Sequence, residues 1–275
     1  MKYKKLLFVP LVLLIISVAC FTFLKGEFSL DIDFKGGTQL SLESSKPVDA
    51  ASIRAAISQY EPAVRVARGL SSYTVIIDVD SSVNSSAVLD DLQKAGYRFD
   101  SESSQTIGAS LGKSFFSQAQ LAFAFAFAFM ALVVFIVFRQ PLPSLYMVMC
   151  AALDITEALL VSQILGINLS LATFAALLLL IGYSVDSDIL LTSRVLKTSE
   201  GEPKERVRGA FRTCMTMSMA AIGAVAVLYF ATSSMVLQQI SAVILIGLLF
   251  DIPNTWLFNA PLLLWWVERK RGCQE

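Results

Sequence analysis

Residues 119–138 read Ala-Gln-Leu-Ala-Phe-Ala-Phe-Ala-Phe-Ala-Phe-Met-Ala-Leu-Val-Val-Phe-Ile-Val-Phe and contain no charged side chain. The alternation of Ala and Phe over 122–129 is typical of a β-strand, but it lies inside a much longer apolar run. About 20 consecutive apolar residues cross the ~30 Å hydrocarbon core of a bilayer as a helix, whereas strands are short. The length of the run therefore predicts a transmembrane helix.

Five further stretches of the chain are long and apolar enough for the same interpretation. They are residues 6–24, 143–165, 168–192, 213–232 and 235–267. The composition agrees, because 55% of the 275 residues are hydrophobic, against about 45–50% in soluble domains. We expect a polytopic α-helical membrane protein with six transmembrane helices. The first helix should stay as an uncleaved anchor, and Pro253 should kink the last one.

The basic residues predict the orientation of these spans. Lysines and arginines gather at the N-terminus, at Arg139, between Arg194 and Arg212, and at 269–271, whereas the short connections near 166–168 and 232–234 have none. The positive-inside rule places both termini in the cytoplasm of a cell-membrane protein. The predicted parts are a cytoplasmic N-terminus with the first helix (1–26), an external domain (27–117), a bundle of five helices (118–268) and a cytoplasmic tail (269–275).

The external segment reads as a small α+β domain. Predicted strands are Leu30–Phe34, Gln39–Leu42, Val64–Ala67, Tyr73–Val79 and one starting at Tyr97–Phe99; predicted helices are Asp49–Tyr60, capped by Asp49, and Ser85–Ala95. The order β-α-β-β-α-β is that of a ferredoxin-like domain.

Acidic residues inside the spans are the candidates for function, because each costs several kcal/mol in a bilayer. There are five, namely Asp154, Glu157, Asp186, Asp188 and Asp251. The first two are three residues apart and share a helix face. Asp186 and Asp188 point apart, and we favour Asp186 as the inward-facing acid because Gly182 shares its face and permits close packing. Structural hydrogen bonds between helices are the alternative for Asp154 and Asp186, and a hydrated interfacial acid is the alternative for Asp188.

Arg212 begins the fifth span and is expected to pair with one of these acids, although it could instead snorkel to the membrane surface. The neighbouring stretch Lys204–Arg212 is a candidate for a basic amphipathic helix on the inner leaflet, or a plain orientation signal. The chain has no histidine, so a proton path would use carboxylates, hydroxyls and water. The residues alone therefore predict a proton- or ion-coupled membrane machine.

Other classes of function fit poorly. Histidine-based catalysis and histidine-ligated metal sites are excluded, and the four cysteines have no metal-ligand spacing. We expect no metal, no cofactor and no enzymatic activity. A formal net charge of zero argues against a nucleic-acid partner.

Four motifs resemble the SecF family, relatives of the resistance-nodulation-division transporters. They are Asp33-Phe34-Lys35-Gly36-Gly37-Thr38, Gly108-Ala109-Ser110-Leu111-Gly112-Lys113, Gly182-Tyr183-Ser184-Val185-Asp186 and Ala260-Pro261-Leu262-Leu263-Leu264. The six spans would correspond to half of such a transporter. Asp154 matches a membrane acid of the family's third span, and Arg212 matches an Arg-Thr pair at the start of its fifth. Where bacterial members read G-Y-S-V-N-D-T, this chain has Asp186-Ser187-Asp188, which is similar to the archaeal branch.

The resemblance implies a complex with SecD beside the Sec translocon, in a membrane whose lipids surround it. It also implies that secretory polypeptides are helped outward by the proton-motive force, with the external domain contacting the emerging chain. Three alternatives stay open. They are one half of a solute/proton antiporter, an intramembrane aspartyl protease using Asp154 and Asp186 without the G-x-G-D signature, and a purely structural role for the acids.

Overall fold

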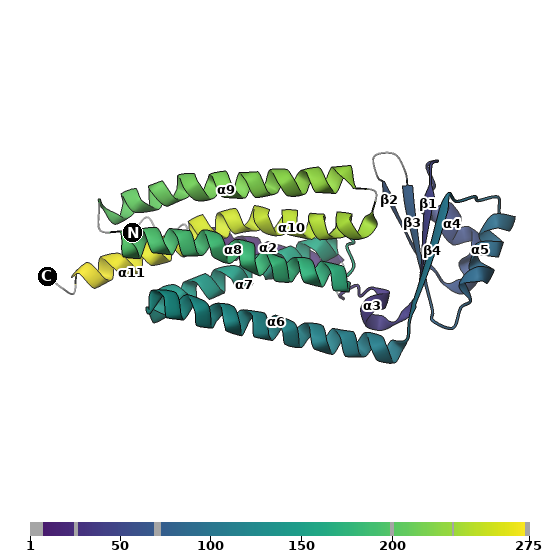
Figure 1. Ribbon diagram of the computed structural model, residues 1–275, viewed down its shortest axis with the longest axis horizontal. Coiled ribbons are helices and arrows are strands. Elements are labelled where there is room, and N and C mark those ends of the chain that lie inside the picture. The colour runs from purple at the N-terminus through teal and green to yellow at the C-terminus, as the bar shows by residue number, and fades with distance from the viewer. Residues whose placement is uncertain (1–7, 25–26, 69–72, 199–200, 233, 273–275) are drawn as a thin grey trace.

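A long helical bundle and a small α/β domain at one end of it make up the molecule (Figure 1). The computed structural model describes residues 8–24, 27–68, 73–198, 201–232 and 234–272. The last helix, α11, ends at the far end of the bundle from the domain (Figure 1).

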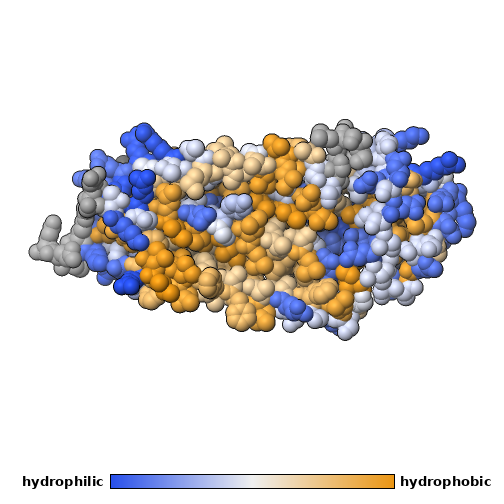
Figure 2. All heavy atoms as spheres, viewed as in Figure 1, coloured by the Kyte–Doolittle hydropathy of each residue, from blue (hydrophilic) through white to orange (hydrophobic). Residues whose placement is uncertain are grey.

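The bundle is built from long apolar helices. They are α2 (Phe8–Leu24), α6 (Ala109–Phe138), α7 (Pro141–Ile164), α8 (Leu171–Lys197), α9 (Pro203–Ala231) and α10 (Met235–Asn254), which continues through a π-helical turn, η2 (Thr255–Asn259), into α11 (Ala260–Gly272). Among the described residues, five helical segments are long and apolar enough to cross a membrane: α6, α7, α8, α9 and the segment 235–270. The apolar helix α2 is shorter, with 17 residues, and positions 6 and 7 of the predicted first span lie outside the described residues. A hydrophobic band along the bundle with hydrophilic ends (Figure 2) agrees with a membrane protein.

Helix α9 corrects one prediction about the basic stretch Lys204–Arg212. We considered a separate helix on the membrane surface, but this stretch forms the first turns of α9, which runs unbroken from Pro203 to Ala231. Glu202 and Glu205 form a reciprocal capping box at its start, which satisfies N–H groups that the first turn leaves unpaired. The basic residues therefore lead directly into the span.

The sixth span is continuous but irregular near Pro253. Proline lacks an N–H and crowds the carbonyl four residues earlier, so it disturbs the hydrogen bonding of the helix around it. Here the disturbance is followed by the wide turn Thr255–Asn259. A π-turn shifts the helical register, which changes the side of the helix that the following residues face.

The α/β domain contains a four-stranded sheet with two helices against one face (Figure 1). The strands are β1 (Gly37–Ser44), β2 (Ala63–Arg68), β3 (Tyr73–Val79) and β4 (Ser101–Ile107); the helices are α4 (Ala50–Ala56), the 3₁₀ turn η1 (Ser58–Tyr60) and α5 (Ser85–Lys94). The spatial order is β2-β3-β1-β4, and all neighbouring strands are antiparallel. Alternating residues of β1 and β3, with side chains of α4 and α5, form the core of the domain.

Two predictions about this domain are wrong. Residues Leu30–Phe34 do not form a strand, because Ile32–Lys35 is a short helix, α3, whose first N–H donates to the Asp31 carboxylate at 2.8 Å. Leu30 makes only an isolated bridge with Leu169. The last strand begins at Ser101 rather than at Tyr97. The predicted cap is confirmed, since Asp49 accepts from the Ser52 N–H at 3.1 Å.

Two of the sequence motifs meet where α3 packs on the start of α6. A Cβ atom on Gly112 would lie 2.9 Å from the Gly36 nitrogen and 2.9 Å from the Phe34 oxygen. A Cβ atom on Gly36, which has φ +80°, would lie 2.6 Å from the Ala109 Cα. Both glycines are therefore needed for close backbone approach. Gly37 follows with φ +144°, and a Cβ there would meet the Val79 oxygen at 2.9 Å.

The short helix α3 also joins the domain to the connection between α7 and α8. The Asp33 carboxylate accepts from the Leu171 N–H at 2.9 Å, so a negative charge lies at the N-terminus of α8. Phe34 is buried between Phe116 of α6 and Phe174 of α8, with ring centroids 5.3 and 5.9 Å away. The family-type motif at 33–37 thus has a structural role at this junction.

Candidate functional site

A cluster of polar side chains lies inside the bundle where α7, α8 and the α10–η2 segment meet. We call it the carboxylate cluster; its members are Asp154 and Glu157 of α7, Ser184 and Asp188 of α8, Asp251 and Asn254 of α10, and Thr255 and Asn259 of η2. All eight are at most 2% exposed. Polar groups so deeply buried in a membrane bundle are costly unless they bond to one another.

One half of the cluster is centred on Asn254. Its Nδ2 atom donates to Asp154 Oδ1 at 2.7 Å and to Glu157 Oε2 at 2.8 Å. The two acids are on the same face of α7, as their spacing predicted. Ser184 donates to the second oxygen of Asp154. A single amide therefore links α7 to α10, and a hydroxyl links α7 to α8.

The other half is centred on Thr255. Its Oγ1 atom lies 3.1 Å from Asp188 Oδ1 and 3.3 Å from Asp251 Oδ1, and Asn259 Nδ2 donates to the same Asp188 oxygen at 2.7 Å. A hydroxyl has only one proton to donate. Thr255 therefore bonds both carboxyl groups either by sharing its one proton between their oxygens, as in a three-centre hydrogen bond, or by accepting a proton from one of them. Its position brings one carboxyl oxygen from α8 and one from α10 to the same hydroxyl group.

The charge balance of the cluster also requires protons. No lysine or arginine is among the buried residues of the described chain, and the ion pairs of Arg65 with Asp31 and Asp78 and of Lys94 with Asp91 lie in the α/β domain, away from the cluster. Four carboxylates ionised together without a cation would cost far more than a folded domain can offset. The oxygens Glu157 Oε1, Asp188 Oδ2, Asn254 Oδ1 and Asn259 Oδ1 also have no protein donor. Protons on the carboxyl groups supply such donors and remove the charge.

The prediction that Asp186 faces the bundle centre is wrong. Asp186 is exposed, along with Gly182 and Tyr183. It lines an open groove of ≈ 560 Å³ beside α9. A Cβ atom on Gly182 would meet nothing within 4 Å, so that glycine permits no close packing here. Asp188 is the buried acid, with 0% exposure. Residues two apart point about 200° from each other, and the helix is rotated the opposite way from our expectation.

The expected pairing of Arg212 with a membrane acid is also wrong. Arg212 is exposed, and none of the ion pairs in the described parts of the chain includes it. Ser187, which stands where bacterial members carry an acid, is 7% exposed, and its carbonyl accepts from the Cys214 thiol at 3.7 Å. The hydrogen bonds that join the cluster include neither Arg212 nor Ser187.

Three polar residues of the sixth span, Asn254, Thr255 and Asn259, were not predicted, because neutral amides and hydroxyls carry no charge that marks them as unusual in a membrane helix. The available signal was the pair of asparagines in an otherwise apolar stretch directly after Pro253. In the described residues, no group of three or more His, Cys, Asp or Glu is arranged to hold a metal ion.

Of the remaining motif residues, Gly108 is the N-cap of α6. The motif at 182–186 places only Ser184 in the cluster. The motifs thus divide between the junction at α3 and the membrane cluster.

Comparison with known proteins agrees with this architecture. Residues 87–269 match the family "Protein export membrane protein SecD/SecF, C-terminal". The chain is 37% identical over 283 residues to the protein-export membrane protein SecF of Methanocaldococcus jannaschii, covering 98% of both chains. It is also 37% identical to SecF of Methanolacinia petrolearia, covering 97% of this chain and 94% of that one.

Among solved structures, the crystal structure of SecDF, a translocon-associated membrane protein from Thermus thermophilus, has the same fold. The TM-score is 0.77 at 19% identity, and the match covers 97% of this chain and 38% of that one. A second structure, SecDF in its super-membrane-facing form, has a TM-score of 0.59 at 17% identity. The chain therefore belongs to the SecD/SecF family of protein-export membrane proteins, as a SecF of the archaeal type.

Proposed function

We propose that this chain is the SecF subunit of a SecDF complex that assists Sec-dependent protein translocation and is driven by the proton-motive force. It would act without enzymatic chemistry, with SecD, the translocon channel and the translocating polypeptide as partners. The family membership supports the export role, and the fold shared with SecDF supports assembly with SecD.

We further propose six transmembrane spans, with α2 as the first. Both termini would be cytoplasmic and the α/β domain external, because the basic residues gather at the end of the bundle away from that domain. The element order and the sheet order β2-β3-β1-β4 support a ferredoxin-like class for the domain.

The observation that carries the proton coupling is the arrangement around Thr255, where one hydroxyl lies between the carboxyl oxygens of Asp188 and Asp251. These two acids are on different helices, Asp188 on α8 and Asp251 on α10. Thr255 donates its proton to the ionised acid, so moving a proton from one acid to the other changes the helix that accepts this hydrogen bond. The membrane potential supplies about 2.3 kcal/mol per charge per 100 mV. That exceeds the net value of about 0.6 kcal/mol for an average interhelical hydrogen bond in a membrane. The free energy of proton entry is thus large enough to replace one set of hydrogen bonds between the helices by another.

The neighbouring acids of α8 give a matched test. Asp188→Asn removes a proton-binding group from the cluster, whereas Asp186→Asn makes the same chemical change two residues away on the exposed face. Export of a secretory reporter should be lost in cells with Asp188→Asn and kept with Asp186→Asn. The amounts of the protein and of assembled SecD in the membrane should be equal in the two strains.

Three outcomes would separate the alternatives. Normal export with Asp188→Asn, and also with Asp154→Asn, would refute the proton relay. Lost export together with lost SecD assembly would indicate that the cluster only holds the helices together. Equal losses for Asp186→Asn and Asp188→Asn would show that burial in the cluster is not the property that matters.

A further inference from the structure

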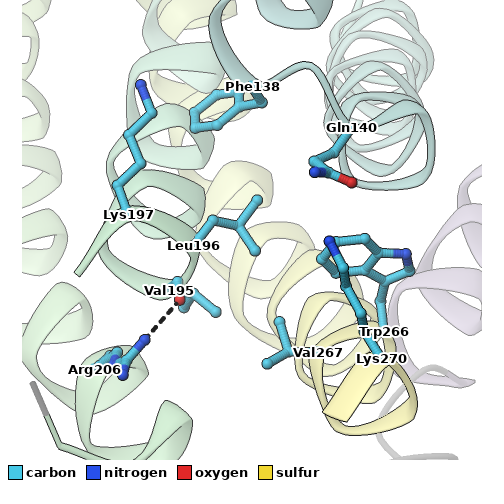
Figure 3. A pocket seen from close by; sticks show the side chains of 9 residues that line it. All are labelled: Phe138, Gln140, Val195, Leu196, Lys197, Arg206, Trp266, Val267 and Lys270. Carbon is cyan, nitrogen blue, oxygen red and sulfur yellow. Dashed lines mark hydrogen bonds between the residues drawn. The ribbon is translucent and has the colours of Figure 1, made fainter. Parts of the chain in front are cut away.

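A pocket of ≈ 310 Å³ lies at the end of the bundle away from the α/β domain. It opens between the end of α8, the start of α9, the α6–α7 connection and α11 (Figure 3). Its walls include Phe138, Val195 and Trp266, and its cationic side chains are Lys197, Arg206 and Lys270. The carboxylate cluster contributes no residue to this pocket.

The three cations come from three different helices, and no acidic residue lines the pocket. Arg206 is fixed in place, because its guanidinium donates to the Val195 carbonyl at 3.1 Å and to the Gly201 carbonyl at 2.9 Å. Lys197 and Lys270 have their ammonium groups 5.2 Å from the Phe138 ring centroid and 5.1 Å from the Trp266 ring centroid. Neither lysine donates a hydrogen bond to another residue of the described chain, so both ammonium groups keep donors for a ligand.

We propose that this pocket binds the phosphate-bearing headgroup of an anionic phospholipid. Basic pockets between transmembrane helices on the cytoplasmic side suit such headgroups. The apolar walls formed by Phe138, Val195 and Trp266 fit the glycerol and the first methylenes of a lipid, which a free phosphate ion lacks. The location favours a lipid as well, because the pocket lies at the end of the bundle away from the α/β domain (Figure 1). Figure 2 shows that the hydrophobic band of the bundle gives way to a hydrophilic surface at that end. Tryptophan is also common at that depth.

The test uses the full chain in nanodiscs and Trp266 as the reporter. The chain has three tryptophans, so Trp256→Phe and Trp265→Phe leave only the one in the pocket. Brominated phosphatidylglycerol or brominated phosphatidylcholine is then titrated into discs of unlabelled phosphatidylcholine, because bromine quenches tryptophan fluorescence on contact. The anionic lipid should quench at a much lower mole fraction. A lysine near a membrane surface contributes about a fivefold preference, so two contribute about 25-fold.

The pocket variant is Lys197→Gln with Lys270→Gln, and the matched control is Arg208→Gln with Arg269→Gln, which removes two charges that do not line the pocket. All four residues are exposed, so the bundle should fold in both variants. The preference for the anionic lipid over phosphatidylcholine should fall by about 25-fold in the pocket variant and stay nearly unchanged in the control.

Equal losses in both variants would overturn the proposal in favour of general surface charge. No preference in the unsubstituted reporter chain would overturn it as well. Competition by millimolar inorganic phosphate or glycerol phosphate would show that the occupant is a soluble anion rather than a lipid. The proposal rests on the proposed orientation in the membrane, but the measurement involves no export, so its result is independent of the proposed role in export.

Discussion

Replacing Asn254 by leucine should strongly destabilise the bundle, because one amide group bonds two buried carboxyl groups. Leucine has nearly the same shape but removes the donor to Asp154 at 2.7 Å and to Glu157 at 2.8 Å. Leaving a buried acceptor unsatisfied costs about 1–3 kcal/mol. Interhelical hydrogen bonds in membranes average only about 0.6 kcal/mol, because the unfolded chain in lipid finds other partners.

The first estimate applies more closely here, since Asn254, Asp154 and Glu157 are all 0% exposed and cannot turn to another donor. We therefore expect a loss of about 3 kcal/mol in the free energy of unfolding. The assay is reversible unfolding of the full chain from mixed micelles by dodecyl sulfate, followed by circular dichroism. The control is Thr216→Val, which removes an exposed hydroxyl bonded to the Arg212 carbonyl of its own helix and should change stability little.

A second substitution tests which atom of the amide matters. Asn254→Asp keeps the size and one oxygen, and in its protonated form it has one O–H donor where the amide donates two N–H bonds. It should therefore lose about half as much stability as Asn254→Leu, and equal losses for the two variants would show that a carboxyl group cannot replace the amide as a donor. A loss below about 0.5 kcal/mol for Asn254→Leu, within the range of an ordinary surface change, would refute the reasoning.

Two further predictions concern the junction and the α/β domain. Gly112→Ala should cost about 1–3 kcal/mol, because the new Cβ meets backbone atoms of Phe34 and Gly36 at 2.9 Å. The control is Gly209→Ala on α9, where a Cβ meets nothing within 4 Å, and it should stabilise the chain by about 0.5–1 kcal/mol. If Gly112→Ala and Gly209→Ala change the free energy of unfolding equally in the same assay, the close packing of α6 on α3 is contradicted. Burial is the main cause that raises the pKa of Asp31 from 3.8, and the Arg65 charge offsets it only in part. The folded chain thus holds this proton more tightly than the unfolded chain, and the contribution of Asp31 to stability falls as the pH rises above about 4. Asp31→Asn should gain in melting temperature relative to the unsubstituted chain as the pH rises above about 4, and a difference that does not change with pH would contradict this.

The elements that physical length determines were predictable from the sequence. A bilayer requires about 20 apolar residues, and the cap at Asp49 needs only a local contact, so both follow from the order of residues. The rotation of a helix about its axis does not follow from the order of residues. For this reason Asp186 was predicted to face inward, although Asp188 is the buried acid. That rotation depends on partners such as Thr255 and Asn259, which are 67 and 71 residues further along the chain than Asp188.

Short buried helices are a second limit on sequence reasoning. The stretch Leu30–Phe34 alternates apolar and polar residues like a strand, yet Ile32 and Phe34 are both buried in a single helical turn, at 1% and 2% exposure. One turn is too short for a helical period to show. The contacts with α6 and with the start of α8 select the helix, and these contacts are distant in sequence.

The connection between the α/β domain and α6 has a mechanical consequence. Strand β4 ends at Ile107 and α6 begins at Ala109, so one glycine joins an edge of the sheet to a helix of 30 residues. At 1.5 Å per residue the helix is about 45 Å long, and a tilt of about 5° about its far end would swing Gly108 by about 4 Å. Because Gly112 and Gly36 leave no space between α6 and α3, the two would move as one stiff arm. A small change of angle at the far end of α6 would therefore reach the α/β domain as a displacement larger than the length of a hydrogen bond.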